Sequence, residues 1–291
     1  MATVLVFGAG GQIGRYLVPQ LLDRGDRVIG ISREARASAH QGLEWLRGDL
    51  HGAMPALPPH DAIFSLGPLD AFADWFERTA TAGPGCVIAF SSMSVASKAA
   101  SPLAAERALA EILRHAEQKV VRGAEARGLR WTLMRPTLIY GAGLDRSLSP
   151  LARWGTRWRL FPQLGGARGL RQPVHAEDLA SACLAAWTQP AAGGRIFELG
   201  GGERLAWATV LERLRMSLPV KTLALPLPFA LVRLALALAR RFPHWRGIPA
   251  GALSRLQTDL VADNRPAQAH LGWSPRAFRP TPSTWQVRPL I

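Results

Sequence analysis

The sequence predicts an α/β protein with a parallel β-sheet covered by helices on both faces. In the first half of the chain, short apolar runs alternate with segments of helical period, the pattern typical of such a sheet. A glycine-rich turn follows the first apolar run directly, at residues 8–14. The 291 residues, 48% of them hydrophobic, suffice for one such domain and a smaller lobe.

The first strand–helix–strand unit is predicted at residues 3–31. Residues 3–7 are apolar and rich in β-branched side chains, as a strand buried on both faces requires. Gly25 ends the helix, and residues 27–31 supply the second strand. The helix itself is indicated by apolar residues at helical spacing: Ile13, Leu17 and Leu21.

The turn between the first strand and its helix predicts a dinucleotide site. Glycine allows positive φ and lets a pyrophosphate approach where a Cβ would collide, while free N–H groups at the helix start favour negative charge. The strand before and the helix after are the context that makes such a pattern specific. The glycines are Gly8, Gly10, Gly11 and Gly14.

The end of the second strand indicates which cofactor binds. An acidic residue there would bond the ribose of NAD and repel the 2′-phosphate of NADP. This chain has Ser32 and Arg33 instead, with Arg36 close behind. Because a guanidinium pairs with a phosphate, we expect NADP rather than NAD; a solvated arginine is the alternative.

The rest of the chain continues the alternation and then changes. Strands are predicted at residues 43–46, 61–66, 86–90 and 129–134, and helices at 70–79 and 102–127. In the second of these helices, the apolar stripe is Leu109, Ile112, Leu113 and Val120. Beyond residue 143 we expect helices at 149–159, 176–188, 205–218 and 228–242, and strands at 196–199 and 223–225.

Composition limits the class of partner. The formal charge of +14 and the isoelectric point near 11.4 suit an anionic partner. Without a dense basic run, a zinc pattern or an aromatic RNA-binding signature, we expect a small anionic substrate rather than nucleic acid, and no metal. The apolar segment 228–242 is too short to span a membrane; contact with a lipid surface or a second subunit stays open, as does monomer or homodimer.

Cysteine usage and the start of the chain predict the compartment. Cys86 lies in a predicted strand and Cys183 in an apolar helix, so we expect two core thiols and no disulfide. The first strand begins at residue 3 without a charged leader, which predicts a cytoplasmic protein.

Four motifs occur in order along the chain: Gly8-x-x-Gly11-x-x-Gly14, Gly48-Asp49-Leu50, Phe90-Ser91-Ser92 with Ser94, and Arg135-Pro136-Thr137-Leu138-Ile139-Tyr140-Gly141. Together they resemble the extended and atypical short-chain dehydrogenase/reductase superfamily, specifically its NAD(P)-dependent epimerase/dehydratase group that acts on nucleotide sugars. Residues 174–180 resemble the segment with which that family returns to its cofactor domain.

The resemblance implies a Rossmann domain and a helical C-terminal lobe that closes over substrate. Residues 1–145, with 172–200, would form the first, and residues 146–171 and 201–291 the second. Predicted cofactor contacts are Gly8, Gly10, Gly11, Gln12, Ile13, Gly14, Ser32, Arg33, Asp49, Leu50, Leu66, Gly67, Ser91, Arg135 and Pro136. Asp49 is a candidate adenine contact, or equally a turn cap.

The same resemblance implies the catalytic and substrate residues. Ser92 corresponds to the family's residue that hydrogen-bonds the reacting carbonyl or hydroxyl. Ser94 is predicted to contact the substrate. Arg168 and Arg171, in a glycine-rich loop, are candidate diphosphate ligands, with surface charge as the alternative.

The family's Tyr-x-x-x-Lys motif is absent from this sequence, because neither Tyr16 nor Tyr140 has a lysine four residues later. The positions that the tyrosine and lysine have in the family correspond to about Leu109 and Leu113 here, and leucine side chains cannot transfer protons. Tyr140 is the predicted substitute, with its pKa lowered by Arg135 or Arg171; a tyrosine packed at the lobe boundary is the alternative.

Two histidines complete the candidates. His115 with Lys119 could form a base on one helix face, or a solvated pair. His175 reads as a core or capping histidine.

Two functions follow from these residues. The first is an NADP-dependent oxidoreductase or epimerase acting on an anionic sugar nucleotide or related substrate. The second is a non-catalytic NADP-binding sensor or assembly subunit, which the missing tyrosine and lysine favour.

Overall fold

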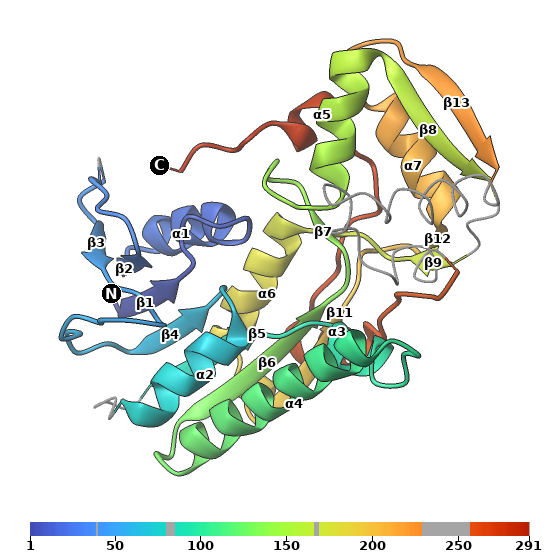
Figure 1. The fold of residues 1–291 in the computed structure, drawn as a ribbon. Coiled ribbons are helices and arrows are strands. Elements are labelled where there is room, and N and C mark those ends of the chain that lie inside the picture. The colour runs from blue at the N-terminus through green and yellow to red at the C-terminus, as the bar shows by residue number, and fades with distance from the viewer. Residues whose placement is uncertain (39, 80–84, 166–168, 229–256, 291) are drawn as a thin grey trace.

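The central element is a seven-stranded parallel β-sheet with the strand order β11-β6-β5-β4-β1-β2-β3 (Figure 1). The computed structural model describes residues 1–38, 40–79, 85–165, 169–228 and 257–290. The strands are β1 (Thr3–Phe7), β2 (Arg27–Ser32), β3 (Leu43–Arg47), β4 (Ala62–Ser65), β5 (Cys86–Phe90), β6 (Arg130–Pro136) and β11 (Arg195–Leu199). The predicted fold class and all seven strands are confirmed, with boundary differences of one or two residues.

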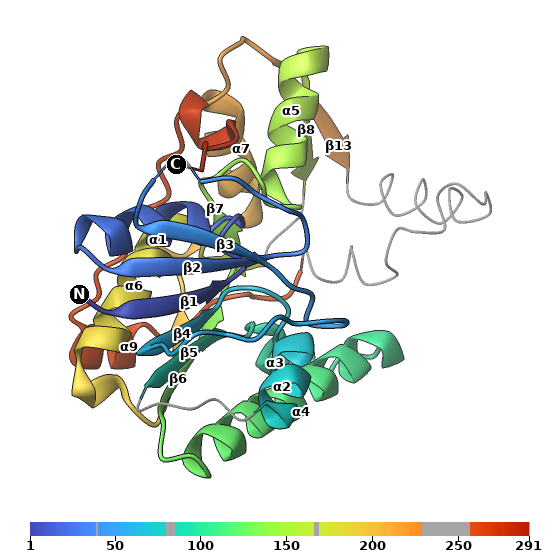
Figure 2. The same cartoon turned by 90° about the vertical axis from the view of Figure 1, so that its left-hand side faces the viewer.

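Helices cover both faces of this sheet (Figure 2). One face carries α1 (Gly14–Asp23), α6 (Ala176–Thr188) and α9 (Arg265–Leu271). The other carries α2 (Leu69–Arg78) and α4 (Ala104–Glu125), while α3 (Ser94–Ser97) follows β5. Each face has its own apolar core, because the strands between them are buried on both sides.

A second group of elements stands beyond the carboxyl edge of the sheet (Figure 1). It contains α5 (Leu148–Trp158), α7 (Trp207–Met216), the parallel pair β8 (Leu160–Gly165) and β13 (Leu223–Pro228), and the short helix η5 (Pro282–Trp285). The short helix η1 (Pro190–Ala192) borders the sheet. Two short strand pairs link this group to the sheet: β7 (Ile139–Tyr140) with β10 (Val174–His175), and β9 (Leu170–Arg171) with β12 (Leu205–Ala206). A third core cluster, with Phe161 and Phe278 fully buried, holds the group together.

The predicted apolar stripe of α4 is only partly buried. Leu109 is 38% exposed and Ile112 is 50% exposed, although Val120 is fully buried. The buried face consists mainly of alanines: Ala110, Ala116 and Ala124. Small side chains let α4 approach its neighbours closely, so the largest apolar residues do not mark the packed face.

The remaining predictions about the chain have mixed outcomes. Cys86 and Cys183 are buried and free, as expected of core thiols. The predicted helix at 228–242 lies outside the described residues except for Pro228, which ends β13. Among the helices that the structure does describe, none combines the length and the apolar character needed to cross a bilayer.

Candidate functional site

A cavity of about 420 Å³ lies at the carboxyl ends of β1, β2, β3 and β4, and we call it the glycine-turn cavity. Eight of the predicted cofactor residues line it: Gly8, Gly10, Gly11, Ser32, Arg33, Asp49, Leu50 and Gly67. Seven others do not line it in the described structure: Gln12, Ile13, Gly14, Leu66, Ser91, Arg135 and Pro136. The sheet topology explains the convergence, because parallel neighbours end at one edge.

The turn that forms the cavity floor requires glycine at particular positions. Gly8 has φ of +79°, and the Gly11 amide donates to the Gly8 carbonyl at 2.8 Å. A Cβ on Gly14 would lie 2.2 Å from the carbonyl oxygen of Ala9. The turn therefore leaves its backbone open toward the cavity and packs α1 directly on the loop.

Two arginines stand at the end of β2. Both Arg33 and Arg36 line the cavity and are exposed. The Arg36 Nε donates to Ser32 Oγ at 3.1 Å, and its guanidinium lies 5.1 Å from the Trp45 ring. A Cβ on Gly10 would come within 2.8 Å of Arg36 Nη1, so this arginine reaches across to the glycine turn. The cavity is therefore positively charged where an anion would enter.

Asp49 lines the glycine-turn cavity and also caps a turn. Its Oδ1 accepts from the His51 amide at 3.0 Å, which is the Asx-turn geometry. The predicted turn cap is confirmed, and the adenine contact stays a prediction.

The serines after β5 have different environments. The Ser92 hydroxyl oxygen accepts from the Ser94 amide at 3.1 Å, at the start of α3. This contact uses the oxygen as an acceptor and leaves the Ser92 proton available for another partner. The Ser91 Oγ is buried without a partner in the described structure.

A second cavity, of about 550 Å³, brings together two of the predicted substrate residues, Ser94 and Arg171. We call it the lobe cavity. Arg171 is 6% exposed, and its Nη1 donates to the carbonyls of Leu170 and Thr258, each at 2.7 Å. Arg168 lies outside the described residues.

Trp207 is a residue of the lobe cavity that the sequence did not indicate. The Arg171 guanidinium lies 5.3 Å from its ring, and its Nε1 is buried without a partner in the described structure. The pairing of β9 with β12 brings the two residues together. No local pattern around Trp207 could have predicted that approach.

The predicted role of Arg135 beside Tyr140 is wrong. Its Nε and Nη2 donate to Glu117 of α4 at 2.8 and 2.5 Å, and Glu117 is only 4% exposed. Burial of that carboxylate requires a paired cation, which is what Arg135 supplies. Arg171 is likewise held elsewhere, by backbone carbonyls and Trp207.

Tyr140 lies in a third cavity, of about 440 Å³, which we call the C-terminal cavity. It is 2% exposed and packs edge to face on Phe278 and His175, with ring centroids 4.8 and 5.0 Å apart. Burial raises the pKa of Tyr140, whereas the sequence predicted a lowered one. The structure therefore favours the packed tyrosine over the proton carrier.

His175 is a capping histidine, as the sequence indicated. It is the N-cap of α6, and its Nδ1 accepts from the Glu177 amide at 3.2 Å. Burial lowers the pKa of His175 to about 4, with the Arg276 charge acting in the same direction. The ring is therefore neutral near pH 7.

The alternative base on α4 is a surface pair. Lys119 Nζ contacts Asp74 Oδ1 at 2.8 Å and Glu77 Oε2 at 3.1 Å, both on α2. The His115 side chain is 64% exposed. The structure therefore favours a solvated pair over a catalytic base for His115 and Lys119.

Comparison with known proteins shows what the chain is similar to. Residues 8–146 match the NAD(P)H-binding family. A UDP-glucose 4-epimerase of Vibrio cholerae is 23% identical over 160 residues, 55% of this chain and 46% of that protein. Subunit 9 of the NADH dehydrogenase 1 alpha subcomplex of Arabidopsis thaliana is 29% identical over 223 residues, 67% of this chain and 53% of that protein. The chain thus spans about half the length of these relatives.

Solved structures share the fold over nearly the whole chain. MoeE5 in complex with UDP-glucuronic acid and NAD superposes with a TM-score of 0.70 at 20% identity, covering 98% of this chain and 97% of the other. The UDP-glucuronic acid 4-epimerase of Bacillus cereus gives 0.68 at 13% identity, covering 98% and 96%. The chain is thus a Rossmann-fold protein with an NAD(P)H-binding domain. It shares this fold with structural neighbours that are NAD-dependent epimerases and dehydratases of the extended short-chain dehydrogenase/reductase superfamily.

Proposed function

We propose that this protein is an NADP-dependent oxidoreductase of the epimerase/dehydratase type, acting on a nucleotide sugar or a related anionic substrate. The observation that carries the proposal is the pair of cavities at the carboxyl edge of the sheet. The glycine-turn cavity would hold the dinucleotide, and the lobe cavity is lined by Ser94, Arg171 and Trp207. Relatives and structural neighbours named for UDP-sugars support this substrate class.

The residues of the glycine-turn cavity would hold the dinucleotide. The glycine turn would lie against the pyrophosphate, and Arg33 with Arg36 would pair with a 2′-phosphate. The nicotinamide, when bound, supplies hydride transfer to and from a substrate carbon.

The chain's own contribution to the reaction centres on Ser92. Its oxygen accepts from the Ser94 amide, which leaves its proton free to be donated, and the acceptor would be the reacting oxygen of the substrate. Arg171, fixed by two carbonyls and Trp207, would hold the anionic part. We assign no side chain to the proton transfer, since Tyr140 lies in another cavity with a raised pKa.

A second function is supported by the missing Tyr-x-x-x-Lys motif. A chain that holds NADP without a proton carrier would serve as a sensor or as an assembly subunit. The relatives named as NADH dehydrogenase subunits, from Arabidopsis thaliana and Dictyostelium discoideum, favour this candidate.

Single-turnover hydride exchange separates the two functions. Protein loaded with NADP+ is incubated with UDP-glucose and with UDP-glucuronic acid that carry deuterium at the sugar C4, and transfer of the isotope to the nicotinamide is followed with the absorbance of the NADPH formed. For an enzyme we expect transfer from one substrate, and Ser92→Ala should slow it by about 100-fold with cofactor affinity unchanged.

The matched control is Ser181→Ala, an exposed serine on α6 whose hydroxyl donates to the Glu177 carbonyl. It should leave both the rate and the affinity unchanged. Tight NADP+ binding with no transfer from either sugar nucleotide would favour the sensor or assembly subunit. A Ser92→Ala variant with the full rate would remove Ser92 from the mechanism.

A further inference from the structure

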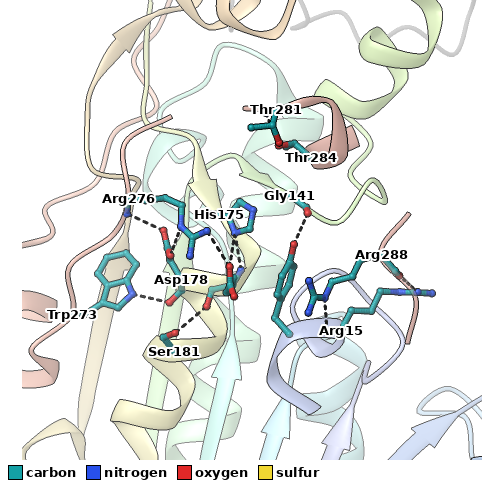
Figure 3. Close-up of polar contacts among 12 residues, drawn as sticks. Arg15, Gly141, His175, Asp178, Ser181, Trp273, Arg276, Thr281, Thr284 and Arg288 are labelled. Carbon is teal, nitrogen blue, oxygen red and sulfur yellow. Dashed lines mark hydrogen bonds and ion pairs between the residues drawn. The ribbon is translucent and has the colours of Figure 1, made fainter. Parts of the chain in front are cut away.

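The C-terminal cavity is separate from both cavities used above, because it shares no lining residue with either. It is enclosed by the start of α1, the turn after β7, the N-terminus of α6 and the chain segment 276–289. Figure 3 shows His175 and Arg276 on one side of this region, and Arg15 and Arg288 on the other. Nothing in the proposed oxidoreductase chemistry uses it.

The lining of this cavity has an excess of positive charge. Three arginines line it, namely Arg276, Arg279 and Arg288, and in the described structure Glu177 is its one carboxylate. Arg276 is paired, with Asp178 at 2.8 Å and Glu177 at 3.0 Å. Within the described parts of the chain, Arg279 forms no ion pair.

Arg288 is positioned by neutral groups. Its guanidinium lies 4.2 Å from the centre of the Tyr16 ring, and its Nε donates to the Arg15 carbonyl at 3.3 Å. Its charge is therefore not neutralised by a carboxylate. Two of the three guanidinium groups are thus available to an anion.

A buried hydroxyl in the same cavity has no partner among the residues that the structure describes. Tyr140 is 2% exposed, yet in the described structure no hydrogen bond reaches its hydroxyl. Its oxygen remains accessible from the cavity, because the sealed side-chain atoms without a partner belong to Gln12, Ser65, Ser91, Trp207 and Thr222. Because the oxygen opens into the cavity, the hydroxyl can donate to an acceptor that enters there.

The walls around the hydroxyl are rigid and aromatic. Phe278 and His175 hold the Tyr140 ring edge to face, and the Tyr16 hydroxyl donates to the Gly141 carbonyl at 2.6 Å. A Cβ on Gly141 would lie 2.2 Å from His175 Nε2, so the glycine permits this close packing. The hydroxyl is therefore held in one place before any ligand enters.

We propose that the C-terminal cavity binds a small phosphate-bearing molecule. The Tyr140 hydroxyl donates to one phosphate oxygen, and Arg279 and Arg288 supply the forked donors that match the others. The volume of about 440 Å³ exceeds that of a phosphate group, and the aromatic walls receive a compact organic part.

Isothermal titration of the full chain with inorganic phosphate tests the proposal. We expect saturable binding that Tyr140→Phe and Arg279→Gln each weaken by about tenfold. Tyr140→Phe keeps the ring and removes a hydroxyl that has no partner in the described structure, so its melting temperature should not fall.

The matched control is Arg27→Gln, which removes an exposed arginine that pairs with Glu44 and lines none of the three cavities, and it should leave this phosphate affinity unchanged. Phosphate binding that is lost in Arg33→Gln but kept in Tyr140→Phe would overturn the proposal, as would no binding at all. Succinate serves as a second anion, and succinate binding as tight as that of phosphate would overturn the assignment to phosphate.

Discussion

The glycine-turn cavity and the C-terminal cavity are built in opposite ways. The first is lined by residues between Phe7 and Ala71, joined only by Arg146 from farther along the chain. The second takes Tyr16 from α1, Tyr140 from β7, His175 from β10 and a segment near the C-terminus. The difference teaches that one site follows from strand ends that are close in sequence, whereas the other exists only after distant segments pack.

This contrast has a physical origin in the sheet. The strands β4, β1, β2 and β3 are neighbours and run parallel, so the turns after them meet at one edge. Around the C-terminal cavity, by contrast, each wall depends on another: Phe278 packs on Tyr140, and Arg276 bonds Asp178 of α6. Substitutions in the two regions should therefore have measurably different effects.

The largest effect is expected from Gly14→Ala in the glycine turn. Its Cβ would lie 2.2 Å from the Ala9 carbonyl, a backbone atom that cannot move aside. We expect a loss of about 3 kcal/mol in unfolding free energy, measured by urea denaturation. Gly67→Ala is the control, because its Cβ meets nothing within 4 Å, and equal stability of the two variants would contradict the local packing argument.

A pH-dependent effect is expected from His175→Asn. The folded pKa of about 4 lies below the unfolded value of about 6.5, so between these values the unfolded chain binds more protons. Wild-type stability from this group is therefore complete above pH 6.5 and falls by up to about 3 kcal/mol as the pH drops to 4.

Asparagine can still cap α6 but does not titrate, so the variant should lack this loss. Urea denaturation of both proteins between pH 7 and pH 4 measures it. Stability curves that stay parallel over this range would show that the His175 ring is not held neutral by burial.

The smallest effect is expected from Arg33→Gln on cofactor choice. Removing one phosphate partner should weaken NADP binding by about tenfold and leave NAD binding unchanged. Fluorescence titration with both cofactors measures the two affinities. Arg27→Gln, at the other end of β2 and paired with Glu44 at 2.6 Å, is the control. Equal weakening of both cofactors by Arg33→Gln would mean that Arg33 does not distinguish them.

Sequence reasoning succeeded where the signal was periodic and local. The seven strands follow from apolar runs, and the structure confirms the capping role among the two predicted for His175. It failed where small residues form the packed face of a helix, or where the partner of a side chain is distant in sequence. The packed face of α4 is made of alanines, and the partner of Arg135 is a glutamate eighteen residues earlier, on a different element.

The sequence by itself determined the parallel sheet, the glycine turn and the positive charge after β2, because these depend on residue order within single strand–turn–helix units. Only the tertiary structure decided that Tyr140 faces the C-terminal cavity, that Arg135 neutralises Glu117, and that Trp207 meets Arg171. Contacts of that kind arise from how separate elements pack, and the period of a strand or helix carries no information about them.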